Sequence, residues 1–465
     1  MSQGSNSPRL RKRLSFVENF GFGLGDTASN FFFQTFNIFL LYYYTDVFGI
    51  EAGVAGTMFF VTRLWDAAND PIMGIFCDRT KTRWGKYRPY LLWMALPYGI
   101  FGYLIFANPD LEGTGRIIYA YFTYSMMMMA YTAINVPYSS LMGVLSSSSY
   151  ARTIASNFRF FGAYGGGLLI SSCVRPLVEK LGSGNELRGF QYTMGLFAIA
   201  SIILFWITFL TTKERVQPPA GQTQNAAEEL KELLKNRPWV ILFFAAVFST
   251  TFIGIRDSVT IHFFKYVAKV GDEVVFGGMD KTSLFLSLGK LMMMLGVFCV
   301  GFLIKLIDKK PLSVALTLIT AACWFSFYFI PINMYGLMLL VNAIGSFMIG
   351  PASALVWSMY GDVADYGQYK FKRRSTGLIH SASLFSLKTG TMIAGFVAGN
   401  LLSRFGFVAN QDQSGRAVWG IMLMFSIIPA FFATAKGIAL WIYPLDRRTV
   451  LKVEQELAIR SGKMA

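Results

Sequence analysis

Long apolar segments recur along this chain and leave little polar sequence between them. Twelve of these segments reach the length of about 20 residues that a helix needs to cross the hydrocarbon core of a bilayer. The segments lie at residues 18–44, 53–77, 89–107, 117–145, 155–178, 190–212, 239–265, 281–307, 311–331, 335–361, 376–404 and 417–444. The 465 residues are 54% hydrophobic and only 15% charged, which excludes an ordinary soluble globular protein. The sequence therefore predicts an all-α membrane protein with twelve transmembrane helices.

One polar stretch between the apolar segments is longer than the others. It covers residues 213–238, contains Pro218 and Pro219, and leaves six apolar segments on either side. We therefore expect a six-helix bundle at 18–212, a central cytoplasmic loop at 213–238 and a second six-helix bundle at 239–444. Residues 1–17 are polar and basic without the apolar core of a signal peptide, and residues 445–465 form a tail. Both end segments are expected in the cytoplasm.

Lysine and arginine gather in alternate connections, and this distribution predicts the orientation of the chain, because such residues collect on the cytoplasmic side. The basic residues that define this side are Arg9, Arg11, Lys12, Arg13, Arg79, Lys81, Arg83, Lys86, Arg88, Lys370, Lys372, Arg373 and Arg374. Both termini are therefore expected in the cytoplasm, with the chain in the plasma membrane, which is the inner membrane of a bacterium. The asymmetry and attraction to anionic membrane lipid explain the net charge of +16 without a nucleic-acid partner.

Three ionisable residues interrupt the second apolar segment, although an ionised side chain in hydrocarbon costs about 3 kcal/mol. Asp66, Asn69 and Asp70 stand at i, i+3 and i+4, which places their oxygens on one face of a helix. Arg63 lies one turn earlier on that face, and one arginine cannot neutralise two carboxylates. The pattern predicts a cation site for sodium or a proton. The alternative is an internal Arg–Asp pair that holds two helices together.

Polar residues also follow one face of the first and fourth segments. Asp26, Asn30, Gln34 and Asn37 form a stripe on the first, and Tyr124, Tyr131, Asn135 and Tyr138 form one on the fourth. Aromatic rings with hydrogen-bonding groups suit a sugar, because its faces carry C–H groups and its edges carry hydroxyls. The alternative for the tyrosines is packing in the protein core.

Basic residues within the segments are fewer. They are Arg159, Arg256, Lys290 and Lys388. If the two aspartates of the second segment hold a cation, these residues leave a surplus of positive charge that an anionic substrate group would neutralise. The alternative is that Arg256 or Lys290 pairs with an acid such as Asp257, or extends to the membrane interface.

Each half has an acidic residue followed by a basic one after its second segment. Asp78-Arg79 stand there in the first half and Asp308-Lys309 in the second, a weak internal repeat. Six plus six segments with such a repeat resemble the major facilitator architecture, in which two bundles rock around a site at the midplane. We expect a cytoplasmic gate, and the alternative is simple solvation of the loops. Its predicted members are Asp78, Arg79, Asp362, Asp365 and Arg373.

Seven motifs in a fixed order resemble one transporter family. They are GLGDTASN, YYYTDVFG, RLWDAANDPIMG, TRWGKYRP, NVPYSSL, ARTIASNFRFFGA and GDVADYGQYKFKRRSTG. Together they resemble the glycoside-pentoside-hexuronide cation symporters, to which the melibiose permease belongs, over residues 16–450. The resemblance implies a monomeric major facilitator protein that couples sugar uptake to sodium or a proton by alternating access and needs no cofactor.

The resemblance also assigns residues. It places the cation site on Asp66, Asn69 and Asp70, with Leu384 at the position of a hydroxyl that assists this site in the permease. Two acids that bind the sugar in the permease correspond to Asn30 and Asn135, whereas the basic residues of its pocket are retained. Ser139 replaces an aromatic residue that stacks on the sugar, so Tyr131 or Tyr138 is expected to take that role. The predicted substrate site comprises Asp26, Asn30, Tyr131, Asn135, Arg159, Arg256 and Lys388.

The replacement of two acids by amides favours an acidic sugar, either a hexuronide or a sulfonated sugar. The alternatives are a neutral pentoside or oligosaccharide, and a lipid or lysolipid carried on the same fold. We do not expect an enzyme, because the chain has two histidines and lacks the motifs His-Glu-x-x-His, Gly-x-Ser-x-Gly and Gly-x-x-x-x-Gly-Lys-Ser/Thr.

Overall fold

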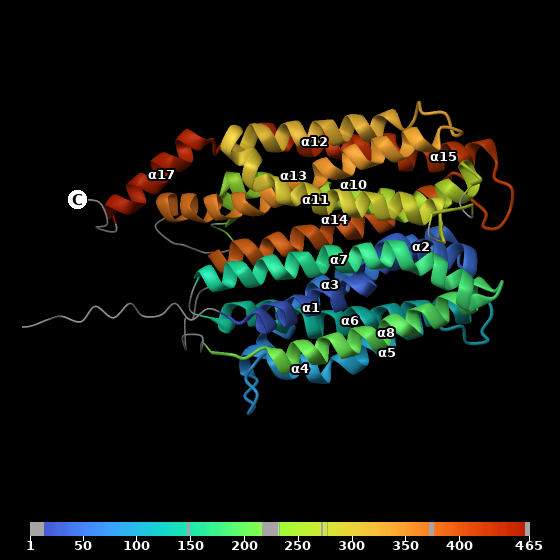
Figure 1. Ribbon diagram of the computed structural model, residues 1–465, viewed down its shortest axis with the longest axis horizontal. Helices are drawn as coiled ribbons and strands as arrows, with labels where there is room; N and C mark the ends of the chain where they lie inside the picture. The colour runs from blue at the N-terminus through green and yellow to red at the C-terminus, as the bar shows by residue number, and fades with distance from the viewer. Residues whose placement is uncertain are drawn as a thin grey trace, which may run out of the picture.

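The computed structural model describes residues 14–146, 149–215, 231, 233–270, 273–276, 278–371 and 376–460. Long helices run side by side along the longest dimension of the molecule (Figure 1). The first helix begins at the same end of the molecule at which the last helix lies. We call this the terminal end, and the other the opposite end.

The N-terminal half contains the first six predicted segments. Its first segment is one nearly continuous helix that changes to π-helical geometry near its end, and its third is broken once. The elements are α1 (Phe16–Ile38), α2 (Leu40–Tyr42), η1 (Tyr43–Val47), α3 (Ala52–Arg79), α4 (Arg88–Trp93), α5 (Ala95–Ile105), α6 (Thr114–Leu145), α7 (Ser149–Gly182) and α8 (Glu186–Thr211).

The C-terminal half repeats this plan. Its first helix also ends in a π-helical stretch, and a small antiparallel hairpin follows. The elements are α10 (Arg237–His262), η2 (Phe263–Val267), β1 (Val274–Phe276), β2 (Met279–Asp280), α11 (Lys281–Leu306), α12 (Lys309–Ser326), α13 (Tyr335–Phe371), α14 (Thr376–Arg404), α15 (Gly415–Phe425) and α16 (Ile427–Trp441). A last helix, α17 (Arg447–Arg460), lies within the predicted tail.

The predicted fold class is confirmed, since each predicted segment lies on one helix or on consecutive helices of the described chain. Six helical stretches in the described chain are both long enough and apolar enough to cross a membrane by length and composition; they include α6, α8, α10, α11 and α13. The helices α1, α3, α7 and α14 are not among them. These four helices carry the polar residues that were predicted from the sequence to be functional, which explains why they are less apolar than the others.

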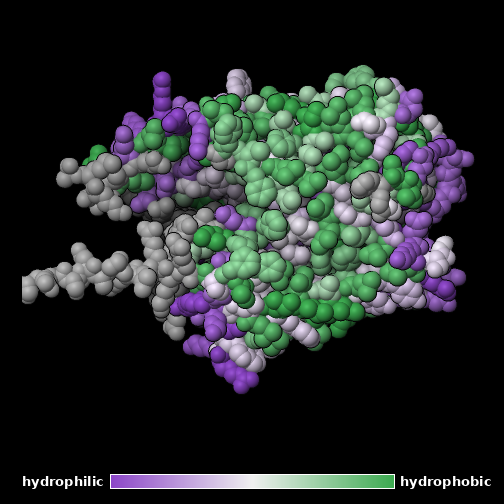
Figure 2. All heavy atoms as spheres, viewed as in Figure 1, coloured by the Kyte–Doolittle hydropathy of each residue, from purple (hydrophilic) through white to green (hydrophobic). Residues whose placement is uncertain are grey.

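The surface matches a membrane protein. On the face shown in Figure 2, apolar residues cover the middle of the molecule and hydrophilic residues gather at its two ends. Large hydrophobic side chains such as Phe122, Phe298 and Phe431 are more than half exposed on this surface. Exposed apolar area of this extent is stable in contact with lipid rather than water.

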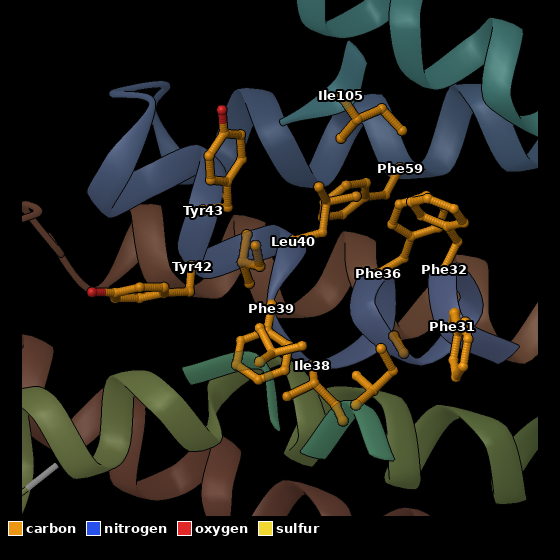
Figure 3. Close-up of a cluster of buried hydrophobic side chains, with 14 of the residues drawn as sticks. Phe31, Phe32, Phe36, Ile38, Phe39, Leu40, Tyr42, Tyr43, Phe59 and Ile105 are labelled. Atoms are coloured by element: carbon orange, nitrogen blue, oxygen red, sulfur yellow. The ribbon is translucent and has the colours of Figure 1, made fainter. Parts of the chain in front are cut away.

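An aromatic core surrounds the first helix. Figure 3 shows Phe31, Phe32, Phe36 and Phe39 extending from this helix among other buried side chains. The ring of Phe32 meets that of Tyr98 edge to face, with centroids 5.4 Å apart. Packing of this kind on several sides fixes the position of the helix, and therefore of the polar residues that it carries.

The bundle boundaries at 18–212 and 239–444 and the cytoplasmic position of the termini stay predictions. Most of the predicted central loop, residues 216–230 and 232, lies outside the described residues, as do residues 1–13 and 461–465.

Candidate functional site

Two aspartates on α3 share one lysine from α14. The ammonium nitrogen of Lys388 lies 2.6 Å from Oδ2 of Asp70 and 3.0 Å from Oδ2 of Asp66. Asp66 is 1% exposed, so its charge is almost completely removed from solvent. The sequence placed Lys388 in the substrate site. The structure instead pairs its ammonium group with the two predicted cation ligands, because α3 and α14 pack closely against each other.

A threonine on α6 completes this group. The hydroxyl oxygen of Thr132 lies 2.5 Å from Oδ1 of Asp66 and 3.0 Å from Oδ1 of Asp70. Each carboxylate therefore directs one oxygen to the lysine and the other to the threonine. We call Asp66, Asp70, Thr132 and Lys388 the carboxylate cluster. The sequence analysis missed Thr132, since a lone threonine in an apolar helix usually bonds its own backbone.

The other two polar residues of this segment lie beside the cluster. Asn69 is half-buried on the same helix. Arg63 is buried and donates from Nε to the hydroxyl of Tyr124 at 3.2 Å. Arg63 therefore does not join two helices through an aspartate, as the alternative interpretation held. Lys388 makes that connection, and it joins the two halves of the protein.

A second group of polar residues lies on α1, α6 and α7. Nε of Arg159 donates to Oδ2 of Asp26 at 2.6 Å, and the guanidinium lies 4.8 Å from the ring centre of Tyr138. The side-chain amide of Asn30 donates to the carbonyl of Asp26 at 2.9 Å. The predicted substrate residues Asp26, Asn30 and Arg159 are thus brought together, with the base already paired to the acid.

Close approach of two helices makes this pair possible. An added Cβ at Gly162 of α7 would lie 2.2 Å from the carbonyl oxygen of Gly23 of α1, which no side chain could tolerate. The glycine lets α7 approach α1 one turn away from Arg159 and Asp26. The same contact is closed by Thr27, whose hydroxyl donates to the carbonyl of Gly162 at 3.1 Å.

The residues from α6 connect the two groups. Oδ1 of Asn135 accepts a 2.8 Å hydrogen bond from Ser29 of α1, and its amide donates to the carbonyl of Tyr131. Tyr131 is half-buried next to Thr132 in the sequence, and its ring lies 6.3 Å from that of Phe33. We call Asp26, Asn30, Tyr131, Asn135 and Arg159 the polar group. Adjacent residues of α6 thus belong to the polar group and to the carboxylate cluster.

Arg256 does not join the polar group. Its guanidinium is buried in the C-terminal half, 3.7 Å from the ring centre of Trp324, and Nη1 donates to Oδ1 of Asn342 at 3.0 Å. Lys290 pairs with Asp257 at 2.8 Å, as the alternative interpretation held. Packing within the C-terminal half, rather than a shared site between the halves, determines where Arg256 lies.

The predicted gate at the terminal end is only partly described. Arg373 and the side chain of Asp78 lie outside the described residues. Arg79 is exposed. Asp362 accepts from Lys309 at 2.9 Å, a contact within the C-terminal half and not between the halves. Asp365 lies half-buried one turn further along α13.

A polar network that the sequence analysis did not predict joins the halves at the opposite end. Asp46 of η1 is its centre, and its carboxylate lies 2.9 Å from the ammonium of Lys265 and 3.4 Å from Nε2 of His262. Tyr266 also donates to this carboxylate, and Asn410 donates to the carbonyl of Asp46 at 2.6 Å. We call these five residues the opposite-end network. The motif YYYTDVFG contained Asp46, but its partners lie more than 200 residues away.

The chemistry of these groups is that of binding. Within the described residues, no three His, Cys, Asp or Glu side chains come together in a way that could hold a metal ion. The carboxylate cluster offers only two acids, so a metal there would need further oxygens from Thr132 or from Asn69.

Comparisons with known proteins agree with the fold and identify the family. A putative glycoside/cation symporter of Escherichia coli is 35% identical over 96% of this chain and 95% of that protein. An inner membrane symporter of the same species is 32% identical over 96% of this chain and 95% of that protein. The crystal structure of a D-xylose-proton symporter superposes with a TM-score of 0.63 at 15% identity, covering 92% of this chain and 97% of that one. Residues 21–447 match the MFS/sugar transport protein family. The chain therefore belongs to the MFS/sugar transport protein family.

Proposed function

We propose that this protein is a symporter that carries a sugar or glycoside across the inner membrane together with a monovalent cation. It is a multi-pass membrane protein of a family of sugar transporters. The relatives named above are symporters, and one is named for glycosides. Because the family and the named relatives are transporters, we propose transport without a chemical step.

The observation that carries this proposal is the contact of Lys388 with both Asp66 and Asp70. The ammonium occupies the place in which a coupling cation would neutralise the two carboxylates. A cation that enters must therefore displace Lys388, or a proton must neutralise one carboxylate and weaken its hold on the lysine. The cluster then responds to the cation by releasing a positively charged side chain from α14.

This release provides a physical basis for coupling. Lys388 belongs to the C-terminal half and the aspartates belong to the N-terminal half, so the cation changes a contact between the halves. Thr132 connects the cluster to α6, and Tyr131 and Asn135 of the same helix belong to the polar group. Cation binding and sugar binding thus act on one helix. We propose that each raises the affinity of the other, and linkage requires the factor to be the same in both directions.

The contacts of Thr132 support a proton as the coupling ion. A hydroxyl has a single proton, yet its oxygen lies within hydrogen-bond distance of both carboxylates. A proton on one carboxyl group would let that group donate to the hydroxyl oxygen while the hydroxyl donates to the other carboxylate. Leu384 supplies no oxygen in place of the hydroxyl that assists sodium binding in the permease. Sodium remains the alternative, with Asp66, Asn69 and Asp70 as its predicted ligands.

The polar group is the proposed sugar site. It offers amides at Asn30 and Asn135, a ring at Tyr131, and an arginine whose charge Asp26 neutralises. Lys388 and Lys290 are also paired with aspartates, so three of the four basic residues within the apolar segments are neutralised by the protein itself. The acidic sugar stays a prediction that now depends on Arg256, and this pairing favours a neutral glycoside at the polar group. A lipid or lysolipid remains the alternative substrate.

The opposite-end network holds the two halves together away from the terminal end. We propose that the termini are cytoplasmic and that the structure is therefore closed toward the outside. Opening to the outside would require Asp46 to leave Lys265, His262 and Tyr266. The predicted gate at the terminal end would act in the reverse step, and we propose that the protein works as a monomer in contact with membrane lipid.

Uptake by reconstituted vesicles tests the proposal. Purified protein is placed in vesicles with an imposed sodium gradient, an imposed proton gradient or no gradient, and labelled neutral glycosides, acidic glycosides and lysolipids are supplied in turn. We expect a glycoside to accumulate above its outside concentration with one of the two gradients. Accumulation of a lysolipid and no glycoside, or glycoside uptake that responds to neither gradient, would overturn it.

A further inference from the structure

A small cavity lies in the C-terminal half, apart from the carboxylate cluster and the polar group. It has a volume of about 40 Å³ and lies between α10, α11 and α13, with Trp324 of α12 on one side. Its polar lining comes from Arg256, Asp257, Thr260, Lys290, Asn342 and Ser346. We call it the Arg256 cavity.

Arg256 enters this cavity with an incomplete set of partners. The residue is 6% exposed. Among the described residues, Nη1 donates to Asn342, whereas neither Nε nor Nη2 has a hydrogen-bond partner. The rings of Trp324 and Phe425 lie 3.7 and 4.5 Å from the guanidinium carbon. Such rings attract the charge, but they do not accept the remaining N–H groups.

The charges around the cavity do not balance. Asp257 follows Arg256 on α10, and its carboxylate accepts from Lys290 at 2.8 Å. Two cations of this region thus share one carboxylate. A buried guanidinium with unpaired donors is costly, and a negatively charged acceptor would satisfy both its charge and its hydrogen bonds.

The wall of the cavity is kept open by a glycine. A Cβ at Gly289 would lie 3.1 Å from both Nδ2 of Asn342 and Oγ of Ser346, the side chains that face it across the cavity. Any larger residue there would reduce the space beside the guanidinium. The volume itself limits the occupant to a few water-sized groups, since a cavity needs about 10–15 Å³ of such space to hold one water molecule. A sugar ring is far too large, whereas one halide ion or one carboxylate group fits.

We propose that the Arg256 cavity binds a compact monovalent anion, with Nε and Nη2 of Arg256 as donors and Lys290 as the second positive charge. Two sources can supply this chemistry: an inorganic halide, or the carboxylate of an acidic substrate. The halide source is independent of the proposed function. Binding of a substrate carboxylate rests on the proposed function, and it would give the protein a separate subsite for the acidic group of the sugar.

Thermal unfolding of the purified full-length protein tests the site. Sodium chloride replaces sodium isethionate at constant ionic strength, because the sulfonate group of isethionate is bulkier than a halide ion or a carboxylate group. In a second arm, methyl glucuronide is compared with methyl glucoside. Above the dissociation constant, each tenfold rise in the free anion concentration should raise the midpoint of unfolding by on the order of 2 °C. A response to chloride identifies a halide, and a response to the glucuronide alone identifies the substrate carboxylate.

Two variants assign the response to this cavity. Arg256→Gln removes the charge, and Gly289→Ala narrows the cavity without changing any charge, so it decides the question if Arg256→Gln does not fold. Gly336→Ala is the matched control, because an added Cβ there meets nothing within 4 Å. We expect the first two variants to lose the anion response and the control to keep it. No response in the unmodified protein, or an equal response in Gly289→Ala, would overturn the proposal. Because this measurement needs no transport, it can fail while uptake is normal.

Discussion

Replacing Lys388 by methionine tests the competition between its ammonium and the coupling cation. The change keeps much of the apolar stem and removes the charge that lies 2.6 Å from Asp70 and 3.0 Å from Asp66. Breaking a buried ion pair from one side costs about 3–5 kcal/mol. We use the lower figure, because the Asp70 side chain keeps 30% of its surface exposed.

That energy becomes available to an incoming cation. In Lys388→Met the two carboxylates face each other without a counter-ion, and sodium or a proton no longer has to displace an ammonium. At 1.4 kcal/mol per tenfold change, 3 kcal/mol corresponds to a cation affinity on the order of 100-fold tighter. The variant should also be less stable than the unmodified protein when the cation is withheld, and should regain stability when it is added.

Cation titrations followed by thermal unfolding measure this effect. Sodium is varied at constant ionic strength, and pH is varied in a separate series. Lys290→Met is the matched control: it removes a lysine of similar burial that pairs with Asp257 outside the cluster, and it should leave the cation affinity unchanged. The reasoning is wrong if Lys388→Met binds both cations no more tightly than the unmodified protein does.

Three further changes probe the remaining parts of the site. Thr132→Val keeps the shape of the side chain but removes its hydroxyl, so cation affinity should fall about tenfold in the same titration, the value of roughly one hydrogen bond. Arg159→Gln leaves a carboxylate of the polar group without its partner; sugar affinity should fall at least tenfold in an equilibrium binding assay, while cation-dependent stabilisation persists. Asp46→Asn weakens the opposite-end network, so spin labels at Glu112 and Gln411, on loops of the two halves, should move apart; an unchanged distance would argue against a role for the network in closure.

The helices and the acidic positions could be predicted from the sequence because both depend on local pattern. A charged residue in a spanning segment stands out whatever it contacts, and this identified Asp66 and Asp70. Their partner could not be found in the same way. Lys388 is 318 residues from Asp70, and its contact depends on how α3 and α14 pack.

Burial explains the other differences between prediction and structure. Arg256 was grouped with Arg159 because both are bases in apolar segments, but four aromatic rings and Asn342 hold it inside the C-terminal half. The gate was predicted from charges in the loops at the terminal end. The contacts that join the halves instead include Asp46 and His262, which are buried within helices and carry no distinctive spacing.

Accumulation driven by an imposed gradient tests the central claim most directly, which is that the two carboxylates on α3 bind the coupling cation. The variant Asp66→Asn/Asp70→Asn is compared in vesicles with Asp412→Asn, a surface change at a side chain that is 96% exposed. We predict that the double variant loses accumulation but still exchanges labelled for unlabelled sugar, and that Asp412→Asn retains both. Full accumulation by the double variant would contradict the account.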